Sequence, residues 1–189
     1  MKRRLIGILA AAAACLVAPA RAQEACKAVT LKKAAVPLAE VYAMADKLAK
    51  AWKPDAIPER ITNTSMGPLQ PDGSSEAWNL NFVSKQANAF VAINTFRGSL
   101  TCWAQSGAAG RIPDLKPDFF RDGAALYALA KQHGEALLKQ GYTVSLGTAA
   151  APSDRHATWY INYEKDNKSG DLTVIVNANT GKVEDVLKH

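Results

Sequence analysis

The sequence predicts an α+β protein in which helices pack on antiparallel strands. Apolar residues recur at the spacing of a helix in residues 38–52 and again in residues 126–137. Apolar and polar residues alternate in residues 78–82, 159–163 and 172–176, which is typical of half-buried strands. Short segments rich in Gly, Asn, Asp and Ser separate these strands and favour tight turns.

Residues 157–186 carry the clearest strand signal. Two strands alternate large apolar residues with polar ones, and residues 165–171 between them are all turn-forming types, so they predict a β-hairpin. Thr180 and Gly181 then predict a turn into a short final strand. The apolar positions are Trp159, Ile161 and Tyr163 on the first strand and Leu172, Val174 and Val176 on the second.

The preceding chain predicts a similar order of elements. A helix begins at Pro37, because the missing N–H of proline costs nothing at a helix start, and it ends before Pro54. Extended segments are predicted at residues 25–31, 57–66, 78–82 and 90–96. Asp118 or Asp122 is predicted to cap a second helix that stops at Gly141, followed by a strand over 142–146 and a loop over 147–153.

Residues 104–118 change in composition and separate the two halves. Small residues at 106–110 are followed by Pro113 and Pro117, a pattern typical of a connecting segment. The predicted division is therefore a leader at 1–22, a first α+β unit at 23–103, a linker at 104–118 and a second α+β unit at 119–189.

Residues 1–22 have the three parts of a secretory signal peptide. Lys2, Arg3 and Arg4 precede an apolar run over 5–17, and Ala20 to Ala22 forms a small-x-small cleavage site. A transmembrane helix is the alternative, but the run is shorter than the roughly 20 residues that span a bilayer. Lipidation at Cys15 is disfavoured because no Leu stands three residues before it. We predict cleavage after Ala22, a periplasmic location and no membrane span in the mature chain.

Removing the leader changes the charge and the cysteine count. Four of the 23 basic residues leave and all 17 acidic residues stay, so the net charge falls to 19 − 17 = +2. No dense Lys/Arg stripe remains, and no nucleic-acid partner is predicted. Cys26 and Cys102 form an even pair, which predicts a disulfide in an oxidising compartment. A reactive thiol beside a histidine is the alternative. The bridge would close a loop of about 77 residues and stabilise the fold by about 4 kcal/mol.

The two halves resemble each other, which predicts an internal repeat. The alternative is chance similarity between amphipathic segments. The strand pattern of Trp, aliphatic residue, Asn and aromatic residue is harder to ascribe to chance than the helix match. The matching segments are 41–45 with 126–130, 78–82 with 159–163, Val91 and Ile93 with Val174 and Val176, and Gly98 with Gly181.

At these residues the sequence resembles the PepSY domain family. The family pattern is a helix, a strand with Trp-x-aliphatic, and a hairpin ending in aliphatic residues and Ala-x-Thr-Gly-x-Val. Residues 159–161, 174–176 and 178–183 match it, within a resemblance that covers residues 122–187. Residues 38–100 form a degraded second copy, in which residues 97–100 replace the Thr-Gly-x-Val pattern. Asn177 stands where the family usually has Asp.

The resemblance implies a cystatin-like α+β fold, a secreted or periplasmic setting and a non-catalytic role. Some members of the family accompany or inhibit peptidases. The family offers no catalytic residues to carry over, and the chain lacks the common nucleophile and metalloprotease motifs. The spacing of His133, His156 and His189 with Cys or carboxylates fits no metal site. We therefore predict no catalytic residue, no metal and no cofactor.

The predicted function is an exported, non-catalytic module that binds or inhibits another extracytoplasmic protein, such as a peptidase, hydrolase or toxin. Trp78 and Trp159 are predicted to lie in the core, and Trp103 to pack on the disulfide. The opposite sheet face is predicted to be more exposed and to bind the partner through Asn79, Asn81, Tyr160 and Asn162. The alternative is a protein that binds or scavenges a small molecule in a pocket between sheet and helices.

Overall fold

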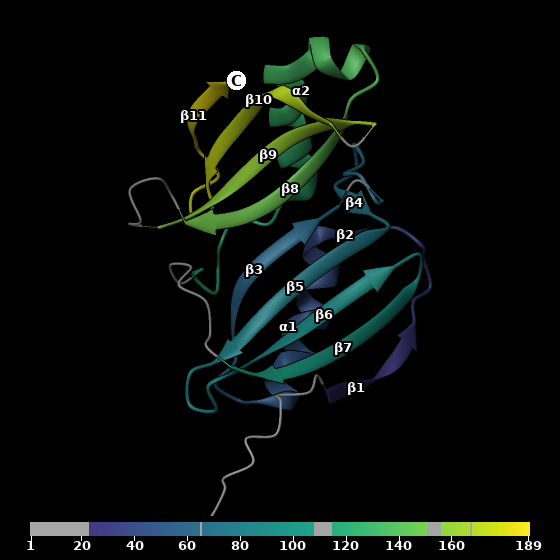
Figure 1. Cartoon of the computed structure of the whole chain (residues 1–189), viewed down its shortest axis with the longest axis vertical. Helices are drawn as coiled ribbons and strands as arrows, with labels where there is room; N and C mark the ends of the chain where they lie inside the picture. The colour runs from purple at the N-terminus through teal and green to yellow at the C-terminus, as the bar shows by residue number, and fades with distance from the viewer. Residues whose placement is uncertain (1–22, 65, 108–114, 151–155, 167) are drawn as a thin grey trace, which may run out of the picture.

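The computed structural model describes residues 23–64, 66–107, 115–150, 156–166 and 168–189, and the predicted leader lies outside them. Within these residues the chain has an α+β fold, in which nine antiparallel strands form one sheet and both helices lie on one side of it (Figure 1). The sheet order is β1-β7-β6-β5-β3-β8-β9-β10-β11, and β2 and β4 form a separate pair. The helices are α1 (Leu38–Trp52) and α2 (Gly123–Lys139), and the strands are β1 (Gln23–Thr30), β2 (Val36–Pro37), β3 (Ile57–Asn63), β4 (Ser74–Ser75), β5 (Ala77–Ser84), β6 (Ala89–Phe96), β7 (Ser99–Ser106), β8 (Thr143–Ala150), β9 (Ala157–Lys165), β10 (Lys168–Asn177) and β11 (Val183–Lys188).

Both predicted helices are present, and their ends have local causes. Pro37 is the N-cap of α1, which ends at Trp52 before Pro54. Asp122 caps α2 by accepting a hydrogen bond from the backbone N–H of Ala125 at 3.0 Å. Gly141 follows α2 with a φ of +86°, a conformation that glycine adopts without strain. Neither helix is long and apolar enough to cross a bilayer, within the part of the chain that the structure describes.

One strand was not predicted, and another runs further than the sequence predicted. β7 lies in a segment for which the sequence predicted no strand, and its last three residues fall in the predicted linker; it forms because β6 pairs with it from Phe96 to Ala89. β8 continues through the predicted loop to Ala150, because β9 pairs with it along its whole length. Pairing with a neighbouring strand satisfies the backbone groups of residues that are too small to show a strand pattern by themselves.

The predicted match of Val91 and Ile93 with Val174 and Val176 was wrong by two residues along the strand, which is one step on the same face. Ile93 pairs with Leu80, and Val174 pairs with Ile161. By register, Ile93 therefore corresponds to Val174. The irregularity in β10 between Ser169 and Thr173 sets this register, because a bulge adds residues to one strand of a pair.

The predicted disulfide is confirmed, whereas the position predicted for Trp103 was wrong. Cys26 and Cys102 are bonded and join the paired strands β1 and β7, with their Cα atoms 5.4 Å apart. Successive residues of a strand point to opposite faces. Cys102 faces the helices and is buried, so Trp103 lies on the other face with 47% of its surface exposed.

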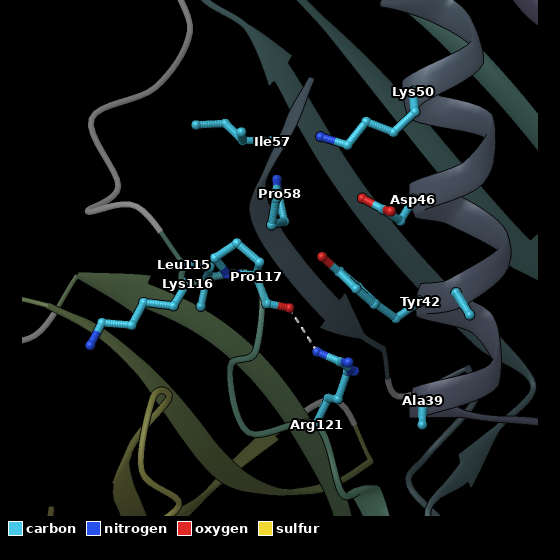
Figure 2. A pocket seen from close by; sticks show the side chains of 11 residues that line it. Ala39, Tyr42, Asp46, Lys50, Ile57, Pro58, Leu115, Lys116, Pro117 and Arg121 are labelled. Atoms are coloured by element: carbon cyan, nitrogen blue, oxygen red, sulfur yellow. Dashed lines mark hydrogen bonds between the residues drawn. The ribbon is translucent and has the colours of Figure 1, made fainter. Parts of the chain in front are cut away.

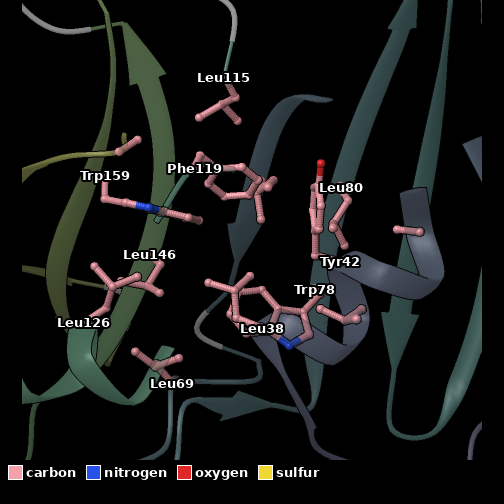
Figure 3. Close-up of a cluster of buried hydrophobic side chains, with 14 of the residues drawn as sticks. Leu38, Tyr42, Leu69, Trp78, Leu80, Leu115, Phe119, Leu126, Leu146 and Trp159 are labelled. Carbon is pink, nitrogen blue, oxygen red and sulfur yellow. The ribbon is translucent and has the colours of Figure 1, made fainter. Parts of the chain in front are cut away.

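One core extends across both halves of the sheet. β3 and β8 meet in its middle, where Thr62 pairs with Gly147. On the helix side, the ring of Phe119 lies between Tyr42 and Trp159 (Figure 3), with ring centroids 4.9 Å and 6.2 Å away. Phe119 comes from the segment that leads into α2, so this segment packs the first half against the second.

Candidate functional site

The sheet face opposite the helices is the first candidate site. Figure 1 shows α1 and α2 behind the sheet, so the near side of β3, β5, β6, β8 and β9 carries no helix in the described structure. Asn79 and Asn81 alternate with buried Leu80 on β5, and Tyr160 and Asn162 alternate with buried Ile161 on β9. The four predicted partner-binding residues therefore share this face, which we call the open face.

The strand register places two of these residues in one row across the junction of the halves. Asn79 pairs with Thr62, Thr62 with Gly147, and Gly147 with Tyr160. Three strand spacings put Asn79 and Tyr160 roughly 14 Å apart. Gly147 has no side chain above the row, which leaves room beside Tyr160. A single partner could contact both halves here.

The four side chains are half-buried and, as the sequence predicted, more exposed than their strand neighbours that face the helices. Neighbouring strands on the same face supply the cover. Asn162 Oδ1 accepts a hydrogen bond from Thr173 Oγ1 at 3.0 Å. Asn81 Oδ1 is buried and has no hydrogen-bond partner among the described residues, which is uncommon for a buried amide oxygen.

The sequence reasoning missed Trp103 as a member of the open face. Trp103 pairs with Ala92, and Ala92 pairs with Asn81. The indole and the unpaired amide oxygen therefore stand in the same row, with small Ala92 between them. The signal was available, because burial of Cys102 in a disulfide places its neighbour on the opposite face.

A groove on the helix side is the second candidate site. It has a volume of about 770 Å³ and lies between α1, the start of β3 and the segment that leads to α2 (Figure 2). Tyr42, Asp46 and Lys50 project into it from one face of α1, one helical turn apart. The other lining residues are Ala39, Ala43, Ile57, Pro58, Leu115, Lys116, Pro117 and Arg121.

Arg121 is held in place at one end of the groove. Its guanidinium carbon lies 5.0 Å from the ring centre of Tyr42 and 5.4 Å from that of Phe119. Its Nη1 donates hydrogen bonds to the carbonyl oxygens of Pro117, at 3.0 Å, and Phe119, at 3.4 Å. Burial, together with the charge of Asp46, raises the pKa of Tyr42 to about 12 against the opposing effect of Arg121. The phenol is therefore protonated at neutral pH and can donate a hydrogen bond.

The histidines lie in three separate places. His133 is half-buried on α2, His156 contacts Glu184 at 2.9 Å, and His189 contacts Thr173 at 3.1 Å. Over the described ranges, no three residues among the His, Cys, Asp and Glu side chains are grouped so that they could hold a metal ion. None of the three histidines lies among the residues of either candidate site.

No protein-family model matches the chain, and no curated protein matches it. One similar solved structure is a crystal structure from Clostridium difficile 630 described as a "putative lipoprotein". It is 16% identical in sequence, and the alignment covers 78% of this chain and 92% of that one, with a TM-score of 0.48.

Proposed function

We propose that the protein is an exported, non-catalytic binding module made of two tandem PepSY-like units with a cystatin-like fold. In this proposal it binds or inhibits another protein of the periplasm, such as a peptidase, hydrolase or toxin. The open face, which holds side chains from both halves and an exposed tryptophan, is the observation that carries the proposal.

The arrangement of the two halves supports the tandem part of the proposal. Starting from the β3–β8 junction, the strand order is β3, β5, β6, β7 in one direction and β8, β9, β10, β11 in the other. Trp78 Nε1 donates to the carbonyl of Val36 at 2.8 Å, and Trp159 Nε1 donates to the carbonyl of Phe120 at 2.7 Å. Each acceptor stands just before a helix. A chance likeness between amphipathic segments would not require the same buried anchor twice.

The disulfide and the leader sequence support export. Disulfides persist in oxidising compartments and are rare in the cytosol, and Cys26 and Cys102 are bonded. The basic, apolar and small-residue parts of residues 1–22 favour a cleaved signal peptide. The periplasm is the compartment that this combination favours in a bacterium.

The composition of the open face supports a protein partner. Tryptophan is enriched among the residues that dominate protein–protein affinity, and Trp103 is 47% exposed. The amides around it can hydrogen-bond to a partner's backbone. The strand β11 adds a second route, strand addition, because it ends the sheet and pairs on one side only, with β10, among the described strands. Val183 and Leu187 on it are 36% and 37% exposed and could contact the added strand.

The test is affinity capture from periplasmic extract with the mature, oxidised chain, residues 23–189. The Trp103→Ala and Asn79→Arg variants change the open face. Met66→Ala is the control, because Met66 is 66% exposed and lies in the loop after β3, outside the strands of the open face. We expect one protein to be captured in stoichiometric amount by the wild type and the control, and to be lost from both face variants. Equal capture by all four chains, or no capture, would contradict the proposal.

A small-molecule binding protein is the second candidate function. The groove beside α1 favours it, because its volume of about 770 Å³ falls in the range of small-molecule sites, roughly 300–1,000 Å³. This role would not use the open face, so the two functions can be tested separately.

A further inference from the structure

The groove beside α1 has an apolar wall and several fixed polar groups. Alanines of α1, Ile57 and Pro58 of β3, and Leu115 and Pro117 of the segment before α2 form the wall. Leu115 is buried, with 3% of its surface exposed. A wall of this kind favours an apolar ligand body, because contact removes apolar surface from water.

The charges around the groove favour a negative ligand group. Lys50 and Arg121 lie on the groove side with one carboxylate, that of Asp46, while the ammonium of Lys116 points away from the groove in Figure 2. The groove therefore has an excess of one positive charge. Figure 2 shows the ammonium group of Lys50, the phenol of Tyr42 and the guanidinium of Arg121 on the groove side of their backbones. Lys50 Nζ is oriented by a hydrogen bond to the carbonyl of Ala56.

Arg121 is the strongest single element of this lining. Stacking on Tyr42 and Phe119 and two hydrogen bonds from Nη1 fix the guanidinium plane. No hydrogen bond from its Nε or Nη2 to another described residue is present, so these donors remain for a ligand. A guanidinium that is already ordered loses less entropy when it binds a carboxylate, and its fork can bind both oxygens.

We propose that this groove binds an amphipathic organic acid, with its carboxylate toward Arg121 and its apolar body along Leu115, Pro117 and Pro58. Tyr42 donates a further hydrogen bond to the ligand, and Lys50 adds attraction at the rim. The inference rests on the second candidate function and names its ligand class. It does not depend on the open face.

The test uses octanoate as the probe and octanol as its neutral counterpart, added to the mature, oxidised chain and followed by amide NMR shifts. We expect saturable shifts for octanoate at Ala39, Ala43, Ile57 and Arg121, and much weaker binding of octanol. Losing the nearby positive charge in Lys50→Gln should weaken octanoate binding by roughly threefold to fivefold, as expected for a partly exposed charge pair. Asp46→Asn should strengthen it.

Lys47→Gln is the matched control, because Lys47 is an exposed lysine of α1 that does not line the groove. It should leave octanoate binding unchanged apart from the weak effect of net charge. Arg121→Lys keeps the charge but not the planar fork, and should weaken octanoate binding while its far-UV spectrum stays that of the wild type.

Three outcomes would overturn the inference. If octanoate and octanol bind equally, or if Lys47→Gln weakens octanoate as much as Lys50→Gln does, the anionic class is wrong while a small-molecule role survives. If neither compound gives saturable shifts around the groove, the second candidate function fails together with the inference.

Discussion

The two halves of the sheet place a tryptophan in the same way but fill the space under their helices differently. In the first half the helix and the strand each supply a ring, and Tyr42 of α1 stacks on Phe82 of β5 with centroids 6.0 Å apart. In the second half Tyr163 of β9 corresponds to Phe82 in the strand pattern, and its Oη donates to the backbone carbonyl of Ala130 in α2 at 2.5 Å. A strand aromatic can thus pack against a helix side chain or against the helix backbone.

The contact of Tyr163 with the helix backbone explains why α2 has a glycine where α1 has an alanine. Ala49 follows Val41 by two turns in α1, and Gly134 follows Leu126 by two turns in α2; all four are buried. A Cβ at Gly134 would lie 2.2 Å from Cζ of Tyr163, so only glycine fits while that ring is present. In the second half, the absence of a side chain at Gly134 on the helix thus makes room for the large Tyr163 ring on the strand.

Removing either tryptophan should have the largest effect. Trp78→Ala and Trp159→Ala each create a large cavity and leave a helix-start carbonyl without its indole donor, and each should lower the free energy of unfolding by about 3–5 kcal/mol. Urea unfolding followed by far-UV circular dichroism measures this without relying on tryptophan fluorescence. If one variant loses less than about 1 kcal/mol, well under the range for such truncations, the two anchors are not equivalent.

Breaking the disulfide should have the next largest effect, and it tests a feature that only the first half has. The sequence separation is 76 residues, so Cys26→Ser with Cys102→Ser should cost about 2–4 kcal/mol. Thermal melts with and without reductant measure it. The wild type should melt lower when reduced, and the double variant should melt at one temperature in both conditions. A reductant effect that persists in the double variant would contradict this explanation.

Exchanging alanine and glycine between the helices should give smaller effects that have different causes. Ala49→Gly should cost about 1 kcal/mol through helix propensity alone. Gly134 lies at a kink in α2 with non-helical backbone angles, φ −123° and ψ 28°, so Gly134→Ala gains little helix propensity. The added methyl group meets the Tyr163 ring, and a net loss of about 1–2 kcal/mol is expected from overpacking. Urea unfolding measures both changes.

The cause of the second loss can be checked with a double variant. Tyr163→Leu removes the ring that the new methyl group meets, so Gly134→Ala should become neutral or stabilising in that background. Ala128→Gly, on the exposed side of α2, controls for propensity. A Gly134→Ala loss that is unchanged beside Leu at 163 would exclude the clash as its cause.

The smallest effect is expected at the second half's edge, where Glu184 bridges β11 to His156. Burial alone would raise the pKa of Glu184, but hydrogen bonds from His156 and Asn177 and the charge of His156 lower it below the usual Glu value. A carboxylate whose folded pKa is lowered adds stability above its unfolded pKa and loses it as the pH falls through the folded pKa. Acid should therefore weaken this edge below the usual Glu range.

His156→Gln should raise the pKa of Glu184 toward its usual value, because the positive charge of His156 and the hydrogen bond between its imidazole and the Glu184 carboxylate are lost. Carbon-detected NMR titration of the Glu carboxyl groups measures it directly. An unchanged Glu184 titration would show that Asn177 alone accounts for the lowered pKa.

Local patterns were sufficient where local forces decide the structure. The helices follow from apolar spacing and their end residues, the hairpins follow from alternation and turn residues, and the disulfide follows from two remaining cysteines. The residue-by-residue correspondence between β6 in the first half and β10 in the second was not accessible in this way. An irregularity at 169–173 shifts the pairing of β10 with β9 without changing the apolar pattern of β10. The side on which Trp103 lies needed the position of Cys102, which the sequence does contain.

The sequence by itself determined both helices, most of the strands, the α+β class and the alternation of core and surface residues along β5 and β9. Only the tertiary structure decided that β3 and β8 join the halves into one sheet, that the rows of Asn79 and Tyr160 coincide, and that Arg121 closes a groove against α1. The physical reason is range. Periodicity and turn chemistry act over a few residues, whereas these contacts join segments that are distant in the chain and depend on how the whole core packs.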